Sequence, residues 1–430
     1  MISLSDMFDR STPPPIQSVP FAFRKPTRMV LANNVPLYII KVSGQEVVRV
    51  DFVFAAGKWH QTQKLQAVFT NRMLREGCRG YSSSDLAERL DYYGAWLELS
   101  VAMNRTFVTL YTLKKFFSYT ISLVQRMLFE PTFPETQFQT IRANNKVQFM
   151  VNMQKGDVLA MRALRRSIYG PFHPCGMQVE EEDYDALQLA NLIDYFHRHY
   201  GSRTCSIYLS GSVDDVVVKQ VESLFGSFEW GNGIPCGSEG FEICPDGETS
   251  NIIKLTSVVQ SSIRMGTLLM DVNDEDYLPM RVLNTTLGGY FGSRLMKNIR
   301  EEKGYTYHIS SDLVTNTSQA LFLISCDCLA DKSTEVIDEV HREMYRLQTE
   351  LVPEEELRMI RNYMMGELCR NYEGAFSLAD AYIYMEHLGL PSTYIEKTME
   401  AIDSTDSVRL QQLAQNYLRP ELLHAIVVCP

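Results

Sequence analysis

The stretch at residues 287–311, LGGYFGSRLMKNIREEKGYTYHISS, decides the fold of the second half of the chain. It opens with a Gly-Gly turn and continues in a helical pattern, because Leu295, Ile299 and Glu302 recur at helical spacing. The pattern breaks at Gly304, where a glycine C-cap is expected. An alternating run follows the break and predicts a strand.

Two hydrogen-bond donors flank this break. Arg300 lies near the end of the predicted helix, and Tyr307 lies on the predicted strand. Both side chains can donate to a peptide carbonyl or to a developing oxyanion, and arginine is always charged. The residue types alone leave another interpretation open, in which Arg300 is only a partner of the helix dipole.

The spacing of the whole stretch closely resembles the C-terminal signature of a known family. That family is the pitrilysin and mitochondrial-processing-peptidase family of zinc metallopeptidases, the inverzincins. The resemblance implies that Arg300 and Tyr307 face a zinc site, where they help to bind substrate and stabilise the tetrahedral intermediate. The matching groups are Gly288-Gly289, Ser293-Arg294-Leu295, Ile299-Arg300-Glu301 and Gly304-Tyr305-Thr306-Tyr307.

The zinc motif of the family is replaced in the first half of the chain. The family carries H-x-x-E-H on a helix, where two histidines on one face bind zinc and the glutamate activates water, with a further Glu ligand much later. The aligned stretch here is QAVFTNRML, with Val68 and Arg72 at the histidine positions and Asn71 at the catalytic Glu. Gln148 stands at the distant ligand. Valine has no lone pair, arginine is a fixed cation, and asparagine takes no proton at neutral pH.

The remaining histidines offer no substitute site with metal-ligand spacing. His197 and His199 flank Arg198 near the end of a predicted helix, and we interpret them as surface partners of the helix dipole. The first half is therefore predicted to have lost its catalytic site.

The totals favour a soluble protein with two cores. The chain has 430 residues, of which 45% are hydrophobic, and this length suits two domains. A net charge of −11 argues against nucleic acid or an anionic membrane as a partner. The nine scattered cysteines, the start without a signal-peptide pattern and the lack of a long apolar run predict a cytoplasmic protein.

The order of predicted elements repeats within the chain. An N-terminal arm (1–25) precedes a first domain (26–226), and a Gly/Pro-rich linker (227–248) leads to a second domain (249–430). Each half runs through two strands, helices, strands and long helices. This order predicts an α+β fold of two similar halves, each an antiparallel sheet with helices on one face. The resemblance implies that the halves close like a clam around a peptide.

Three functions are consistent with this sequence. The leading hypothesis is the non-catalytic subunit of a heterodimeric zinc metallopeptidase, which supplies Arg300 and Tyr307 while a homologous H-x-x-E-H chain supplies the zinc. On this hypothesis the chain itself holds no cofactor, and its partners are that subunit and a peptide substrate. The alternative is a structural or scaffolding homologue without a catalytic role. A third hypothesis is a self-sufficient peptidase with a rearranged metal site.

Overall fold

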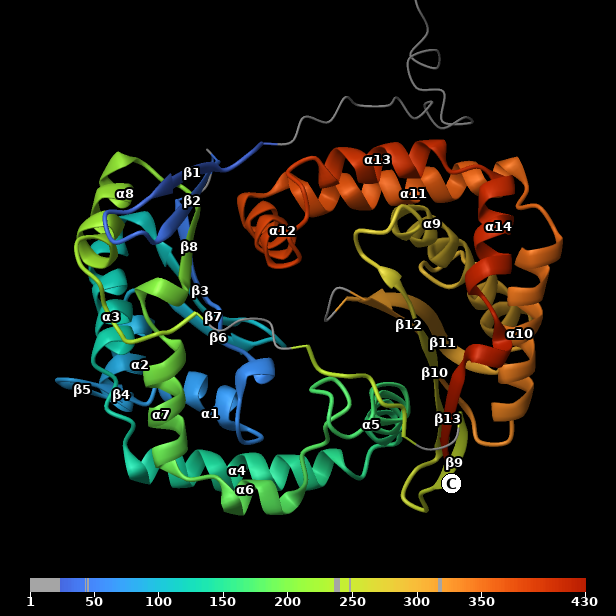
Figure 1. Cartoon of the computed structure of the whole chain (residues 1–430), viewed down its shortest axis with the longest axis horizontal. Helices are drawn as coiled ribbons and strands as arrows, with labels where there is room; N and C mark the ends of the chain where they lie inside the picture. Colours follow the sequence, from blue (N-terminus) through green and yellow to red (C-terminus); the bar gives the residue numbers. More distant parts are fainter. Residues whose placement is uncertain (1–23, 43, 45, 236–239, 247–248, 316–318) are drawn as a thin grey trace, which may run out of the picture.

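Two β-sheets, one in each half of the chain, organise the molecule (Figure 1). The fold is that of a computed structural model, which describes residues 24–42, 44, 46–235, 240–246, 249–315 and 319–430. Most of the predicted arm (1–25) and parts of the predicted linker (227–248) lie outside the described residues. None of the described helices is long and apolar enough to cross a membrane.

The first sheet has the strand order β1-β2-β8-β3-β7-β6. Its central strand β3 reads VVRVDFVF, and alternation along a strand sends neighbouring side chains to opposite faces. Val50 and Phe52 enter a hydrophobic core, whereas Arg49 and Asp51 lie on the other face. The strands span Thr27–Val30 (β1), Pro36–Lys41 (β2), Val47–Phe54 (β3), Trp96–Val101 (β6), Thr106–Leu113 (β7) and Cys205–Gly211 (β8), beside a small hairpin of Gly77–Cys78 (β4) and Tyr81–Ser82 (β5).

The second sheet has the order β11-β12-β10-β13-β9. Its strands span Ser250–Lys254 (β9), Gln260–Asp271 (β10), Thr306–Val314 (β11), Gln319–Leu329 (β12) and His424–Cys429 (β13). The order repeats that of the first sheet from β6 to β2, with β11 in the place of β6 and β10 in the place of β3. The α+β fold of two similar halves is therefore confirmed.

One pair in each sheet corrects the expectation of purely antiparallel sheets. Strand β2 runs parallel to β8, and β9 runs parallel to β13. In each half these two strands are separated by nearly all the helices of that half. A connection of this length allows the last strand to return parallel to the first.

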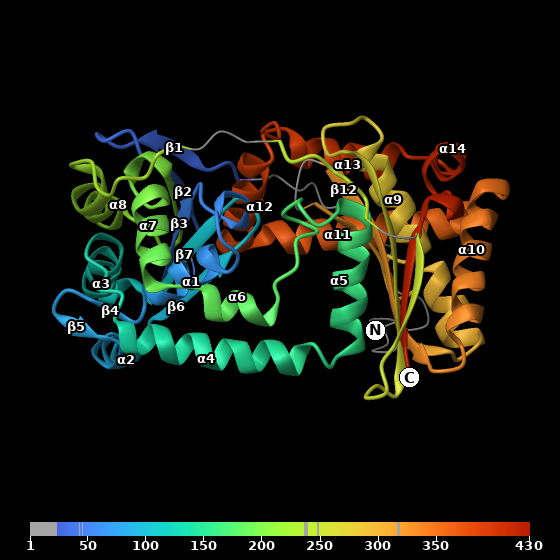
Figure 2. The ribbon, with the colours of Figure 1, turned by 60° about the horizontal axis from the view of Figure 1, so that its bottom comes forward.

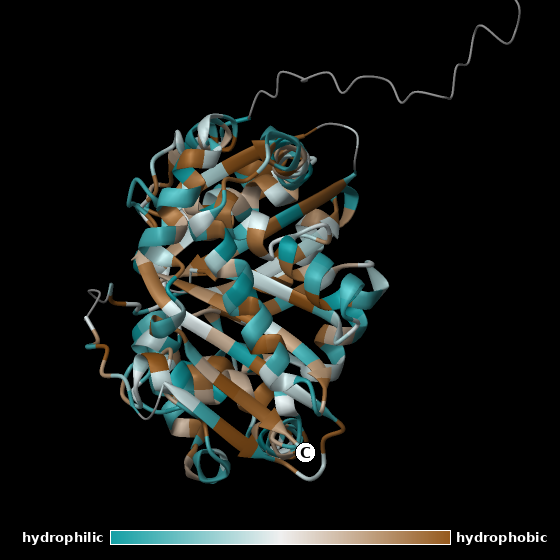
Figure 3. Cartoon of the chain, turned by 90° about the vertical axis from the view of Figure 1, so that its right-hand side faces the viewer, coloured by the Kyte–Doolittle hydropathy of each residue, from teal (hydrophilic) through white to brown (hydrophobic). Residues whose placement is uncertain are grey.

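Helices of each half pack against the outer face of its own sheet or against one another (Figures 1 and 3). Figure 3 shows hydrophobic residues along much of the strands, while the helices mix hydrophobic and hydrophilic residues. In the first half these helices include Gln66–Met73 (α1), Ser83–Tyr92 (α2), Phe117–Phe129 (α3), Glu135–Asn152 (α4), Glu181–Ala186 (α6), Leu189–His199 (α7) and Asp215–Val221 (α8). In the second half they include Tyr277–Leu287 (α9), Met296–Glu302 (η6), Ser333–Thr349 (α10), Glu354–Glu373 (α11), Tyr394–Ser404 (α13) and Ser407–Tyr417 (α14).

Two helices cross between the halves and cover the inner faces, which the sequence did not predict. After α4, helix α5 (Gly156–Tyr169) packs against β10 and β13 of the second sheet (Figure 2). After α11, helix α12 (Ala375–His387) packs against β8 and β2 of the first sheet. Each half thus donates one helix to the sheet of the other half.

Candidate functional site

The predicted signature folds as a tight turn, a helix and a strand. Gly288 lies so close to β11 that a Cβ atom there would come within 2.7 Å of the backbone nitrogen of Ser311. Helix η6 is wound as a π-helix, with the Lys303 amide donating to the Asn298 carbonyl five residues earlier. Gly304 then takes a φ of +66°, a left-handed conformation that favours glycine. The expected helix end at Gly304 is confirmed, although the last turns are wider than an α-helix.

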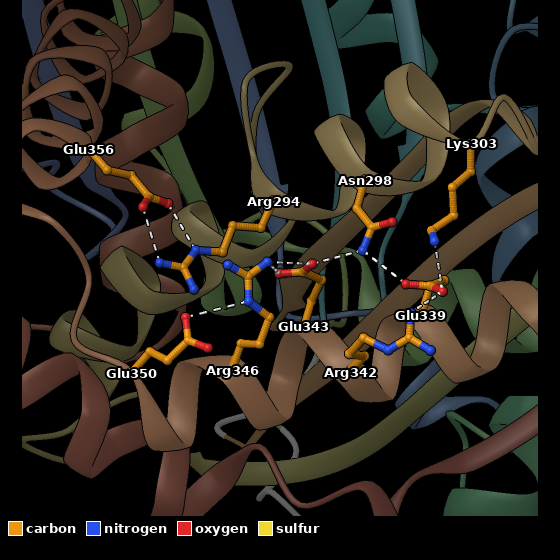
Figure 4. Close-up of polar contacts among 9 residues, drawn as sticks. All are labelled: Arg294, Asn298, Lys303, Glu339, Arg342, Glu343, Arg346, Glu350 and Glu356. Atoms are coloured by element: carbon orange, nitrogen blue, oxygen red, sulfur yellow. Dashed lines mark hydrogen bonds and ion pairs between the residues drawn. The ribbon is translucent and has the colours of Figure 1, made fainter.

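A polar network fixes η6 against α10 and α11 (Figure 4). Arg294 donates two parallel bonds to Glu356, at 2.9 and 3.0 Å. Asn298 donates to Glu343 at 2.7 Å and to Glu339 at 3.1 Å, and Lys303 pairs with Glu339 at 3.0 Å. Bidentate and charge-assisted bonds of this kind are strong and directional. They hold the helix that carries Arg300 in one position.

Arg300 and Tyr307 both have donor capacity to spare. The guanidinium of Arg300 stacks on the Phe291 ring at 4.3 Å from the ring centre, and its Nη1 is buried without a hydrogen-bond acceptor among the described residues. Tyr307 is 89% exposed on the edge strand β11. The register of β11 shifts between Thr306 and Ile309, a bulge that leaves the tyrosine pointing outward. Neither side chain lines the larger cavity described below.

The three positions that match the zinc motif lie on α1. Asn71 is buried, and its amide donates to the backbone carbonyls of Ser100 and Phe107 at 3.1 and 3.2 Å. Arg72 is exposed and donates to the side chain of Asn145 on α4. Val68 is half-buried. Asn71 thus joins the helix to β6 and β7, a structural role at the place of a catalytic carboxylate.

These residues do not fit a zinc ion. Gln148 is exposed on α4 and donates to Asn152, one turn further on, at 3.2 Å. The donor set would combine an aliphatic side chain, a fixed cation and two amides, whereas zinc in proteins takes imidazole, thiolate and carboxylate ligands. Among the described residues no cluster of three histidine, cysteine, aspartate or glutamate side chains is arranged to hold a metal elsewhere.

One histidine expected at the surface lies in the core. His197 is exposed, as predicted, but His199 is buried and packs on the Tyr195 ring at 4.3 Å. Burial lowers the pKa of His199 to about 4, and the neighbouring His60 and Arg198 add to this shift. His199 is therefore neutral near pH 7, because helix α7 turns its last residue inward.

A polar cavity of about 480 Å³ lies between the inner face of the first sheet and α12. Its lining includes Arg49, Tyr111 and Thr109 from the sheet, with Asp380 and His387 from the helix. Arg49 donates to Asp51 at 2.8 and 3.0 Å and to Asp380 at 2.5 Å, so one arginine links the two halves. This cluster was not predicted from the sequence. Its signal was a pair of opposite charges two residues apart within the apolar strand β3.

A histidine at the other end of the cavity is also held neutral. The Arg105 guanidinium donates to Nδ1 of His387 at 3.3 Å. Burial, together with the positive charge of Arg105, lowers the pKa of His387 to about 4. The cavity therefore offers both charged and neutral hydrogen-bonding groups near pH 7.

Comparisons with known proteins agree with this picture of a peptidase fold with a replaced zinc motif. The family model described as the Peptidase M16 inactive domain matches residues 186–364. An uncharacterized zinc protease, YmxG of Bacillus subtilis, is 24% identical over 81% of this chain and 83% of its own length. A protein named non-peptidase homolog YmxG, from Helicobacter pylori, is 20% identical over 77% of this chain and 76% of its own length.

Solved structures share the fold across almost the whole chain. The M16 inactive domain of Pseudomonas fluorescens superposes with a TM-score of 0.83 at 20% identity, covering 94% of this chain and 98% of that one. A protease of Helicobacter pylori gives a TM-score of 0.86 at 13% identity, covering 95% of this chain and all of that one. The molecule is thus a two-halved peptidase homologue without the zinc motif. The resemblance predicted from residues 287–311 is confirmed, and the chain is a degenerate relative of the pitrilysin-type M16 peptidases.

Proposed function

We propose that this chain is the non-catalytic subunit of a heterodimeric zinc metallopeptidase. Arg300 and Tyr307 bind the peptide and stabilise the transition state, while a homologous partner carrying H-x-x-E-H supplies zinc and the general base. The observation that carries the proposal is the pair of unused donors on the second half. The Arg300 side chain is only half-buried and its Nη1 has no acceptor among the described residues, while Tyr307 is almost fully exposed on an edge strand.

Two further observations support a role in trans. The polar network of η6 holds Arg300 in place without using its guanidinium, as preorganised electrostatic stabilisation requires. The unpaired edge of β11 beside Tyr307 can accept an extended peptide through backbone hydrogen bonds. A substrate held at this edge would lie next to both donors.

The test begins with purification of the chain from its native cells, to find whether an H-x-x-E-H chain accompanies it in equal amount. Peptide cleavage by that complex is then measured for Arg300→Ala, which we expect to lower kcat about 100- to 1000-fold. Tyr307→Phe should cause a smaller loss. The exposed Arg358 on α11 forms no ion pair with any described residue, so Arg358→Ala is the matched control and should leave turnover unchanged. Full turnover in both the Arg300 and the Tyr307 variants would refute the assigned roles.

A second candidate is a scaffold without a catalytic role. It is supported by the contact between Arg300 and Phe291, which gives the arginine a packing partner within its own half. If the chain is a scaffold, Arg300→Ala should lower the unfolding temperature of the isolated chain. No peptidase chain should then be recovered with the protein from its native cells. The two functions therefore differ in what accompanies the chain and in whether Arg300 affects kcat or only stability.

A further inference from the structure

A second cavity, of about 190 Å³, opens beside the replaced zinc motif. A single ordered water needs roughly 10–15 Å³ of such space, so the cavity has room for a ligand. Val68, at the place of the first zinc-binding histidine, is part of its wall. The remaining wall comes from the segment before α1, from Met103 between β6 and β7, from α5 and from residues 174–179.

The wall of this cavity is strongly cationic. Lys58, Lys64, Arg162 and Arg165 all line it, and none of its lining residues is acidic. The chain as a whole carries a net charge of −11, so this local excess of positive charge is opposite in sign to the net charge of the chain. A concave site lined by charges of one sign concentrates the field and attracts ions of the opposite sign.

Two of the four cations are already paired with acidic groups outside the wall. Lys64 pairs with Asp183 at 3.0 Å, and Arg162 pairs with Glu180 at 2.9 Å. These pairs fasten α1 and α5 to the segment that follows the cavity wall. Because both acidic partners lie outside the wall, these pairs position Lys64 and Arg162 without filling the cavity.

The other two cations have no counter-charge in the described part of the chain. Neither Lys58 nor Arg165 forms an ion pair or a side-chain hydrogen bond with any described residue. Both side chains line the same cavity. Burial and the positive charge of Arg165 both lower the pKa of Lys58. Burial raises the pKa of the adjacent Cys175 thiol to about 11, so this group stays neutral and provides no anion.

We propose that this cavity is an oxyanion-binding site, in which Lys58 and Arg165 together hold a carboxylate or phosphate group. An anion between two adjacent cations relieves their repulsion and forms charge-assisted hydrogen bonds with both. On this proposal, the space beside Val68, which the resemblance aligns with a metal-binding histidine, takes an anion instead of a cation.

The larger cavity suggests the source of the oxyanion. Met103, in the hairpin between β6 and β7, lines both cavities, so the two spaces adjoin at this residue. A peptide lying in the larger cavity would place an acidic side chain within reach of Lys58 and Arg165. A free inorganic anion is the other source with the same chemistry.

The experiment uses the purified full chain without a partner, at constant ionic strength because exposed charges are screened by salt. Calorimetry measures binding of the acetylated, amidated peptide Ala-Glu-Ala-Glu-Ala, of its Gln counterpart and of inorganic phosphate. We expect the Glu peptide to bind at least about ten-fold more tightly than the Gln peptide, since a charged hydrogen bond contributes about 1.5–3 kcal/mol. The double variant Lys58→Gln/Arg165→Gln should lose at least about ten-fold of this affinity.

The matched control removes two positive charges elsewhere. Lys219 on α8 and Lys254 on β9 are exposed and form no ion pair with any described residue, so Lys219→Gln/Lys254→Gln should bind like the unaltered chain. If the first double variant does not fold, the single variant Arg165→Gln takes its place. Binding of phosphate alone would support the site and assign it to a free anion. Equal binding in the site variant and the control, or no binding of peptide and phosphate, would overturn the proposal. The result does not depend on a peptidase partner, so it is separable from the proposed function.

Discussion

The two helices that cross between the halves cover equivalent sheet faces in different ways. Helix α5 meets the second sheet through a continuous apolar cluster that includes Leu164, Ile168, Leu323 and Val428.

Helix α12 meets the first sheet through a mixed surface. Its first turns contribute Ala375, Leu378 and Ala379 to a small apolar cluster, while Asp380, Glu386 and His387 form polar contacts or line the large cavity.

The difference determines how well each of the two contacts excludes water. An apolar contact excludes water along its whole length and is worth about 25 cal/mol per Å² of buried apolar surface. A polar contact replaces hydrogen bonds to water and therefore gains less net free energy. A water-filled cavity can lie beside such a contact at little cost. The repeated fold therefore has one dry side, where α5 packs on the second sheet, and one wet side, where the large cavity lies between α12 and the first sheet.

The largest effect is expected from breaking the ion pair that joins α12 to the first sheet. Asp51 has no exposed surface and Arg49 is 6% exposed, so Arg49→Met leaves a buried carboxylate without its cation. We expect a loss of about 4 kcal/mol in the free energy of unfolding, measured by urea denaturation.

The matching double variant separates the charge from the packing. In Arg49→Met/Asp51→Asn the buried negative charge is gone, and Asp380 is exposed enough to be hydrated by water. Most of the lost stability should return. A double variant as unstable as the single one would show that the shape of Arg49, and not its charge, holds α12 in place.

A smaller loss is expected on the dry side. Leu164 on α5 is fully buried in the apolar cluster, so Leu164→Ala should cost about 3 kcal/mol through lost burial and the cavity that it leaves. The exposed Val151 on α4 is the control, and Val151→Ala should change stability by less than about 0.5 kcal/mol. A cost for Leu164→Ala as small as that of the control would contradict the description of this side as tightly packed.

Much of the fold could be predicted because its local signals agree with the tertiary structure. Gly304 ends its helix in the left-handed conformation that only glycine adopts readily, and the motif at residues 287–311 carried the family resemblance. Val68, Asn71 and Arg72, which the resemblance aligns with the zinc motif, lie on a single helix, as their spacing predicts.

The remaining features depend on contacts between distant parts of the chain. The Arg49–Asp380 pair joins residues 331 positions apart, so no local sequence pattern predicts this contact. The inward turn of His199 and the cationic cavity around Lys58 and Arg165 likewise arise only when α1, α5 and α7 are packed together. The bulge that exposes Tyr307 is set by pairing with β12 rather than by its own sequence.

The smallest of the expected stability effects is a pH dependence that arises from buried histidines. The two histidines whose pKa falls to about 4 are His199, in the first core, and His387, beside the wet cavity. An ordinary histidine has a pKa near 6.5, so between about pH 6.5 and 4 the unfolded chain binds protons that the folded chain does not. Stability is therefore fully present above pH 6.5 and falls as the pH is lowered toward 4.

The buried His199 allows this slope to be tested. Between pH 7 and pH 5 its protonation in the unfolded chain should lower the free energy of unfolding by about 2 kcal/mol. His199→Gln should remove that part of the slope in urea denaturation at pH 7, 6 and 5, whereas the exposed His197→Gln should leave the slope unchanged. An unaltered slope in His199→Gln would mean that the first core admits a protonated histidine, and it would contradict the assignment of this part of the slope to His199.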